Sequence, residues 1–295
     1  MQRASAQRSG EVTFPMGKIQ TTEALAPAPI RAGGAVGDLR LHEFRSRVFR
    51  NTRFVRVWLP PGYDDAENQN RRYPVLYLND GQNLFEGSSS FTGVEWQADE
   101  TSDRLIREGA VPPMIVVGID NAGKDRLREY MPHRSMHPMM LRALGRYYPD
   151  FLMKEVMPFV ERNYRVATGP ENTGLGGSSL GALIALYTAI VRPEVIGRLL
   201  IESPSLWVSN RQIIKDSRTV RIWPERIFLA AGTAEAGSPD RSRAVVDDVR
   251  ELAAIVRRAV LSERRLRLVI QDGAGHTESA WAERFPEALQ FLFGQ

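Results

Sequence analysis

The stretch GLGGSSLGALIALYTAI holds two adjacent serines that could supply a catalytic nucleophile. A serine on a sharp strand-to-helix turn needs the pattern Gly-x-Ser-x-Gly, because side chains two positions before and after it would collide. Centred on Ser179, these positions are Gly177 and Gly181. Centred on Ser178, one of them is Leu180, which does not fit. The pattern therefore predicts Ser179 as the nucleophile, and a glycine-rich turn before a buried helix is the alternative interpretation.

A serine hydroxyl needs a base to take its proton, and the chain offers four histidines. His276 lies in QDGAGHTESAW, directly after the last predicted strand and before the last helix. His42 precedes the first predicted strand, and His133 and His137 lie in the proline-bounded loop PHRSMHP. In hydrolases with this type of nucleophile turn, the histidine follows the serine and the acid along the chain. We therefore predict His276 as the base.

A carboxylate must hold this histidine in one tautomer, and the loop GTAEAGSPD is its expected source. Glu235 comes first in this loop and is nearest to the end of the preceding strand. Asp240 is the reserve candidate, although an acid at the start of a helix is common for ordinary reasons. Asp272 shares the loop of His276, which makes its approach to the far ring nitrogen awkward. We predict Glu235 as the acid.

Acyl transfer also needs hydrogen-bond donors for the oxyanion that develops on the substrate. The backbone N–H of Leu180, next after the candidate nucleophile, is one expected donor. The loop after YPVLYLND supplies the other, because Gly81 permits a tight turn that points the N–H of Gln82 inward. A plain strand-end turn is the alternative, since Asp-Gly is a common turn pair.

These residues must be positioned by an alternating series of strands and helices. An N-terminal pair of antiparallel strands is expected in RSRVFRNTRFVRVWL, joined at Asn51–Thr52 and ended by Pro60–Pro61–Gly62. The strands that follow are expected at 73–80, 114–120, 172–178, 197–203, 226–232 and 265–271. The helices are expected at about 98–108, 141–163, 180–191, 241–260 and 278–292, and Pro149 and Pro158 mark breaks or restarts within the second of them.

This order predicts an α/β fold with a mostly parallel, doubly wound sheet of about eight strands, antiparallel at its N-terminal side. Ligands bind at the carboxyl ends of the strands in such sheets, and each candidate above follows a predicted strand. Residues 1–38 are rich in Ala, Pro, Gly and Gln and are expected to form a flexible arm, with one domain at 39–295.

The composition excludes several other classes of protein. The chain has no cysteine, which rules out thiol catalysis and cysteine-ligated zinc. His133 and His137 have helical spacing but lie in a loop with no evident third ligand, so no metal is expected. The third glycine of a dinucleotide fingerprint is replaced by Ser179, and no cofactor is expected. Mixed charges with a net charge of +4 do not indicate a nucleic-acid partner.

Candidate substrate contacts come from aromatic and polar residues near the strand ends. Trp96, Trp207, Asn83 and Tyr130 are expected to line the pocket, and core packing is the alternative for the two tryptophans. The segment 121–150 is the expected specificity element. Its arginines at 126, 128 and 134 could meet an anionic substrate or could simply be solvated.

Several motifs together resemble one known family. They are LYLNDGQNLF, WQADE, VVGIDN, REYMP, GGSSLGALIAL, ESPSLW, AAGTAE and GHTESAWAERFPEALQFL, in this order. From about residue 42 onward the chain is similar to the Putative esterase family of α/β-hydrolases, which includes feruloyl, acetyl-xylan and enterochelin-type esterases. The resemblance implies an α/β-hydrolase fold without a large cap domain. It implies the roles given above for Ser179, Glu235, His276, Gln82 and Leu180.

We therefore predict a serine carboxylesterase that acts through an acyl-enzyme on short-chain, carbohydrate-linked or siderophore-type esters. An acyltransferase with the same triad and a non-catalytic binding protein of the same fold are the alternatives. The oligomeric state and the natural acyl and alcohol groups stay open. The first residues lack the apolar core of a signal peptide, which predicts a cytoplasmic location as written, with a mature secreted form as the other option. No membrane span is expected.

Overall fold

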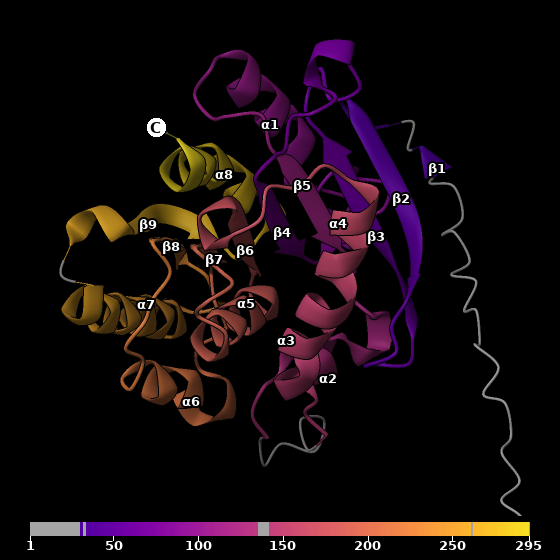
Figure 1. Cartoon of the computed structure of the whole chain (residues 1–295). Coiled ribbons are helices and arrows are strands. Elements are labelled where there is room, and N and C mark those ends of the chain that lie inside the picture. Colours follow the sequence, from indigo (N-terminus) through magenta and orange to yellow (C-terminus); the bar gives the residue numbers. More distant parts are fainter. Residues whose placement is uncertain (1–29, 32–33, 135–141, 261, 295) are drawn as a thin grey trace, which may run out of the picture.

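The computed structural model describes residues 30–31, 34–134, 142–260 and 262–294 of the chain. The described strands form one nine-stranded sheet in the order β1-β2-β3-β5-β4-β6-β7-β8-β9 (Figure 1). The strands are β1 Ile30–Arg31, β2 Asp38–Arg45, β3 Thr52–Leu59, β4 Val75–Asn79, β5 Ile115–Ile119, β6 Thr173–Ser178, β7 Arg198–Glu202, β8 Arg226–Ala234 and β9 Leu266–Gly275. The principal helices are α1 Ala98–Arg107, α2 Arg126–Tyr130, α3 Tyr148–Phe151, α4 Met157–Asn163, α5 Leu180–Val191, α6 Val208–Ser217, α7 Pro239–Val260 and α8 Glu278–Phe293.

The direction of the strands follows the prediction from the sequence. β1, β2, β3 and β5 pair antiparallel in succession, and the pairs from β5 through β4 to β9 are parallel. Every residue of β4, β5 and β6 is buried, as expected for strands that are covered on both faces. The predicted α/β architecture with antiparallel N-terminal strands is confirmed, and β1 adds a two-residue edge to the expected eight strands.

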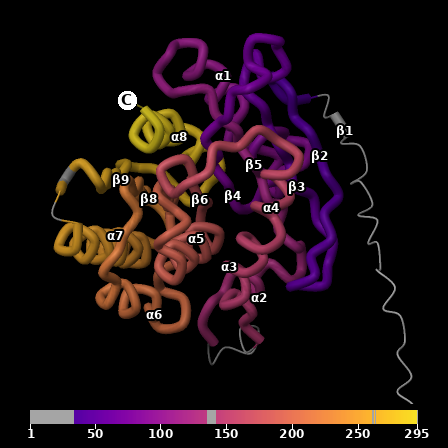
Figure 2. Tube along the Cα trace, in the orientation of Figure 1, coloured from indigo at the N-terminus to yellow at the C-terminus, as the bar shows by residue number. Residues whose placement is uncertain are grey.

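Two hydrophobic clusters cover the two faces of the sheet. Leu105 of α1 and Phe285 and Leu289 of α8 belong to the cluster on one face. Leu183 of α5 and Leu252 of α7 belong to the cluster on the other face. The path of the chain brings α8 back beside α1, far from it in sequence (Figure 2). The helices therefore close the long sides of the sheet and leave the carboxyl ends of its parallel strands for the loops.

The position of the first predicted strand differs from the structure. The first strand was expected in the residues just before Asn51, but β2 ends at Arg45 and residues 46–51 form the turn of the hairpin. Glu155 fixes this turn, because its carboxylate accepts hydrogen bonds from the Ser46 hydroxyl and from the N–H groups of Arg47 and Val48. Such a long-range partner leaves no local trace in the sequence.

The predicted helix at 141–163 restarts at Pro149 and Pro158, as expected. In its described part, α3 leads into a wider π-helical turn at Leu152–Val156 before α4 begins at Met157. Pro158 stands in the first turn of α4, where its missing N–H is tolerated. The short helices α2 and α6 were not predicted, since α2 has only five residues and α6 follows a Ser-Pro-Ser turn with no long apolar period.

The end of the predicted N-terminal arm contacts the rest of the structure. Residues 34–36 contact the domain: the Gly34 N–H donates to Glu86, the Val36 N–H donates to Asp99, and the Val36 carbonyl accepts from the Trp58 indole. These contacts attach the end of the predicted arm to α1 and β3.

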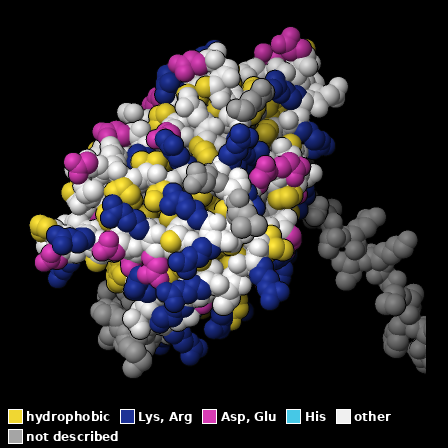
Figure 3. Space-filling model, turned by 90° about the vertical axis from the view of Figure 1, so that its left-hand side faces the viewer, with side chains coloured by type: hydrophobic (Ala, Val, Ile, Leu, Met, Phe, Trp, Pro, Cys, Tyr) yellow, Lys and Arg dark blue, Asp and Glu magenta, His cyan; other side chains and the backbone are white. Residues whose placement is uncertain are grey.

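Charge is mixed over the surface. On the face seen in Figure 3, arginine and lysine side chains stand among acidic and hydrophobic ones. Arg257 and Arg258 at the end of α7 are exposed, as expected for a solvated helix end that precedes a strand. No helix in the described ranges combines the length and the apolar character that a bilayer span requires.

Candidate active site

Ser179 stands between β6 and α5 in a strained backbone conformation. Its φ of 58° and ψ of −122° are unfavourable for a residue with a side chain. The two flanking glycines make this turn possible: a Cβ on Gly181 would lie 2.9 Å from Asp80 Oδ2, and a Cβ on Gly177 would lie 3.0 Å from the carbonyl carbon of Gly181. The strand-turn-helix context and the crowding are those that the Gly-x-Ser-x-Gly pattern predicts.

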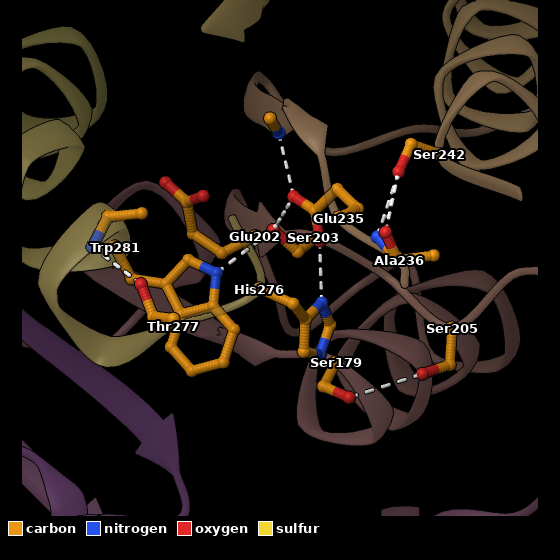
Figure 4. Close-up of polar contacts among 12 residues, drawn as sticks. Ser179, Glu202, Ser203, Ser205, Glu235, Ala236, Ser242, His276, Thr277 and Trp281 are labelled. Atoms are coloured by element: carbon orange, nitrogen blue, oxygen red, sulfur yellow. Dashed lines mark hydrogen bonds and ion pairs between the residues drawn. The ribbon is translucent and has the colours of Figure 1, made fainter. Parts of the chain in front are cut away.

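Hydrogen bonds from the neighbouring strand hold this turn in place. The Ser179 N–H donates to the Glu202 carbonyl at 2.9 Å, and the Ser179 carbonyl accepts from the Ser205 N–H at 3.1 Å. The Ser179 hydroxyl lies 3.3 Å from the Ser205 hydroxyl. In Figure 4 it is directed toward Ser205, while the imidazole of His276 lies between Ser179 and Glu235. The hydroxyl position is set by a single side-chain torsion, which has three staggered minima.

The last two strands bring Glu235 and His276 together. β8 and β9 extend beyond their predicted ends, and Ala234 pairs with Gly275. Glu235 and His276 directly follow these two paired residues and therefore lie side by side at the carboxyl ends of the strands. Glu235 Oε2 and His276 Nδ1 are 2.6 Å apart, and the Glu235 side chain is almost completely buried. The other ring nitrogen of His276, Nε2, remains available on the side of the cavity.

The environment of Glu235 keeps its carboxylate charged. Burial works to raise the pKa of Glu235, but hydrogen bonds from His276, from the Gly232 N–H and from the Ser203 hydroxyl outweigh burial and lower this pKa below its usual value. The Gly232 N–H is 2.7 Å and the Ser203 Oγ 2.5 Å from Oε1. A carboxylate that accepts several donors at this distance is firmly oriented as well as ionised.

The competing acids lie elsewhere. Asp240 is exposed in the first turn of α7. Asp272 is also exposed and accepts a hydrogen bond from the Thr233 hydroxyl. Of the three acids considered from the sequence, Glu235 is the one in contact with His276.

Behind Glu235 lies a buried polar layer that the sequence analysis did not identify. Ser203 follows β7 with a φ of 44°, donates to Glu235 and accepts from the Trp281 indole at 2.9 Å (Figure 4). Beside it, Glu202 and Arg284 form an ion pair at 2.7 Å, in which both side chains are almost fully buried. The sequence signal was present in ESPSLW and in GHTESAWAERF, but it gave no role to these residues.

The turn after β4 has the features expected for an oxyanion site. Asp80 adopts a left-handed conformation with a φ of 59°, and residues 81–83 form one turn of 3₁₀ helix. A Cβ on Gly81 would lie 2.5 Å from the backbone of Gly118, so no other residue fits there. The first N–H groups of a helix lack partners within it, which applies to Gln82 here and to Leu180 at the start of α5.

Polar side chains brace this turn from the loop after β5. Arg126 donates to both carboxylate oxygens of Asp80, each at 2.7 Å, and Asn121 donates to Oδ1 at 2.7 Å. The Asn121 N–H also donates to the side-chain oxygen of Gln82 at 3.2 Å. Arg126 thus holds the turn, which is neither of the two roles considered from the sequence, contact with an anionic substrate or a solvated surface charge.

A cavity of about 620 Å³ connects these groups. Its walls include Ser179, His276, Gln82 and Asn83, together with residues from the segment that follows β4. Its full lining is Asp80, Gln82, Asn83, Ser89, Phe91, Thr92, Asp120, Asn121, Gly123, Arg126, Ser178, Ser179, His276, Glu278 and Trp281. The candidate nucleophile, base and oxyanion turn therefore open into one space of the size that small ligands occupy.

The four residues that were expected to line the substrate pocket lie in different environments. Asn83 lines the cavity as predicted. Trp96 is buried and packs on Trp281 and Phe285, and Tyr130 is buried with its hydroxyl accepting from the Asp80 N–H, so both support the site from behind. Trp207 is 58% exposed and lies outside the lining. The packing interpretation therefore holds for Trp96, and the expected lining role of Tyr130 is wrong because its side chain is buried.

The aromatic residues that do reach the cavity were missed. Trp281 forms part of the wall and meets the imidazole of His276 edge to face, with ring centroids 5.1 Å apart. Phe91 lines the cavity and is 90% exposed. Nothing in the local sequence distinguishes Phe91, because its position at the rim depends on how the segment after β4 folds back.

Only one of the two histidines considered for a metal site is described. His133 contacts Asp216 at 2.8 Å, and His137 lies outside the described residues. Among the residues that the structure describes, no cluster of His, Cys, Asp and Glu could hold a metal ion.

Comparison with known proteins decides the family. Residues 46–292 match the family described as "Putative esterase", which is most of the chain. The chain belongs to this family. It is therefore an esterase, a hydrolase of carboxylic esters, as the sequence motifs predicted.

The individual relatives compared here share low sequence identity with this chain. The chain is 27% identical over 225 residues to the ferri-bacillibactin esterase of Bacillus subtilis, which covers 69% of this chain and 73% of that protein. It is 25% identical over 204 residues to an endo-1,4-beta-xylanase/feruloyl esterase of Xylanibacter ruminicola, covering 68% of this chain and 25% of that protein. The crystal structure of the BES protein from Bacillus cereus superposes with a TM-score of 0.70 at 18% identity, covering 92% of this chain and 99% of that one. That structure supports the α/β-hydrolase fold.

Proposed function

We propose that this esterase works through an acyl-enzyme on Ser179, with His276 as the general base and Glu235 as the acid that orients it. The observation that carries the proposal is the contact between Glu235 and His276 at the edge of the cavity into which Ser179 also opens. A strained serine turn, a buried charged carboxylate and a half-exposed imidazole are the parts that such chemistry requires.

In the first step, His276 takes the proton of Ser179 while Oγ bonds to the ester carbonyl carbon. The negative charge that develops on the carbonyl oxygen is held by the N–H groups of Leu180 and Gln82. Glu235 stabilises the imidazolium that forms, since it accepts a hydrogen bond from Nδ1–H and itself stays ionised. Collapse of the tetrahedral intermediate then breaks the ester bond, and His276 gives its proton to the departing alcohol.

In the second step, a water molecule replaces the alcohol. His276 takes a proton from this water as the water oxygen bonds to the acyl carbon. The bond between Ser179 Oγ and the acyl carbon then breaks, His276 returns its proton to Oγ, and the acid leaves. The Ser205 hydroxyl, 3.3 Å from Ser179 Oγ, offers the resting nucleophile a neutral partner between turnovers. No cofactor enters either step.

The test is the substitution Ser179→Ala, assayed with a short-chain aryl ester. We expect turnover to fall by at least about a thousandfold with an unchanged melting temperature, because the nucleophile is lost while the fold is kept. A fluorophosphonate probe should label the wild-type protein and leave the variant unlabelled. Ser178, the neighbouring serine, remains in the variant and serves as the internal control. Full activity in the variant, or label recovered on Ser178, would overturn the assignment.

A further inference from the structure

The cavity contains charged side chains that the proposed chemistry does not use. In the described part of the chain, its acidic lining residues are Asp80, Asp120 and Glu278, and its basic lining residue is Arg126. His276 adds the imidazole that acts as the base in the proposed mechanism. The question is which of these charges a substrate would meet.

Two of the three carboxylates are balanced by arginines. Asp80 accepts two hydrogen bonds from Arg126, and Asp120 accepts two from Arg56, the nearer at 2.7 Å. Arg56 also lies 3.8 Å from Glu86, so it is shared between two acids. Neither guanidinium therefore presents an uncommitted positive charge to the cavity.

Glu278 differs from the other two acids. Its carboxylate accepts from two neutral donors, Thr92 Oγ1 at 3.1 Å and Asn83 Nδ2 at 3.4 Å. Arg126 attracts Glu278 at longer range, but its hydrogen bonds end at Asp80. Glu278 is only 8% exposed and follows His276 by two residues, so its charge lies inside the wall beside the reacting groups. Charge within a partly enclosed site is screened less than charge on the open surface.

We propose that Glu278 makes this cavity selective by charge, so that it accepts neutral or cationic esters and disfavours esters with a negative charge on either half. This inference rests on the proposed function, because it assumes that substrates bind beside Ser179 and His276. Asn83 and Thr92 hold the carboxylate in the wall, and Arg126 is kept from neutralising it by its pairing with Asp80. The substrate class is thus uncharged or positively charged esters of small molecules.

The experiment compares three para-nitrophenyl esters of similar size: the anionic monoester of succinate, its neutral methyl ester, and an analogue that ends in a quaternary ammonium group. For a unit charge held about 8 Å from Glu278, with an effective dielectric constant of about 20–40, the repulsion corresponds to roughly a five- to thirtyfold effect on kcat/KM. In Glu278→Gln we expect the ratio of kcat/KM for the anionic ester to that for the neutral ester to rise by this factor. The ratio for the cationic ester should fall.

Two variants and salt separate a charge effect from a structural one. Glu278→Asp keeps the charge and should keep most of the wild-type ratio. Glu287→Gln makes the same change of net charge on α8, about 13 Å further along the helix, where Glu287 pairs with Arg267 at an exposed position, and it should leave the ratio unchanged. The ratio in the wild type should also move toward unity at about 1 M salt, where the Debye length is about 3 Å.

The inference is overturned if Glu278→Gln leaves the ratio unchanged, or if Glu287→Gln changes it equally. Failure of the proposed function has a different signature, since Ser179→Ala would then still hydrolyse the neutral ester. The two outcomes are read from separate measurements on the same substrates.

Discussion

Replacing Ser203 by alanine tests whether the buried layer behind Glu235 supports catalysis. The hydroxyl donates to Glu235 Oε1 at 2.5 Å and accepts from Trp281 Nε1 at 2.9 Å. A hydrogen bond to a charged group contributes roughly 1.5–3 kcal/mol, and a buried donor without a partner costs about 1–3 kcal/mol. Because the two losses share one oxygen atom and are not additive, we expect the free energy of unfolding to fall by about 2–4 kcal/mol.

The same change should slow the reaction without abolishing it. In Ser203→Ala, Glu235 keeps its contact with His276 Nδ1 and the hydrogen bond from the Gly232 N–H. The carboxylate is then less firmly held and stabilises the imidazolium less well. We expect kcat/KM to fall about tenfold, which corresponds to about 1.4 kcal/mol. Initial rates with a short-chain aryl ester measure this value.

The lowered pKa of Glu235 gives the stability loss a pH dependence. A carboxylate whose pKa is lowered in the folded protein stabilises the fold above its unfolded pKa, which is about 4.5. This contribution disappears as the pH falls through the folded pKa. The share of the loss that acts through Glu235 should therefore be complete at neutral pH and should shrink in acid. The share that comes from the Trp281 indole should persist.

Urea unfolding at neutral and acidic pH, followed by fluorescence, measures both shares. Ser217→Ala is the matched control, because Ser217 is also buried but donates to the Ile213 carbonyl within α6. It should lose stability with no loss of kcat/KM and no pH dependence. An unchanged kcat/KM in Ser203→Ala, or a loss of stability that stays constant as the pH falls, would refute the reasoning.

Two further predictions concern the acid and the rim. Glu235→Gln should lower kcat/KM on the aryl ester by about a thousandfold or more, because the amide no longer stabilises the imidazolium, whereas Asp240→Asn should change it less than about twofold; the opposite pattern would move the acid to Asp240. Phe91→Ala should raise KM about fivefold for an ester with an aromatic acyl group and leave KM for an acetyl ester nearly unchanged. The exposed ring lines the cavity, and its removal costs about 1 kcal/mol of apolar contact with the aromatic group. Equal changes for both esters would contradict a binding role.

The alternation of strands and helices could be predicted from the sequence because it depends on local patterns. Continuous apolar runs indicated β4 and β5, and the long apolar stretch after Ser179 indicated α5. The hairpin turn at 46–51 could not be placed, because it is held by Glu155 from a distant helix. The restarts of the helix before β6 could be predicted from Pro149 and Pro158, whereas the π-helical turn between them could not.

The sequence by itself determined which residues are chemically able to act. The glycine spacing selected Ser179 over Ser178. His276 was selected because it is the one histidine of the four that directly follows the last predicted strand. These choices rest on backbone sterics and on side-chain type, which a sequence states directly.

Only the tertiary structure decided what stands next to what. Glu235 meets His276 because β8 and β9 pair as far as Ala234 and Gly275, and this register is set by the whole sheet. The same assembly buries Trp96, brings Phe91 to the rim and leaves Glu278 with neutral partners. Contact, burial and charge balance arise between segments far apart in the chain, so no local pattern encodes them.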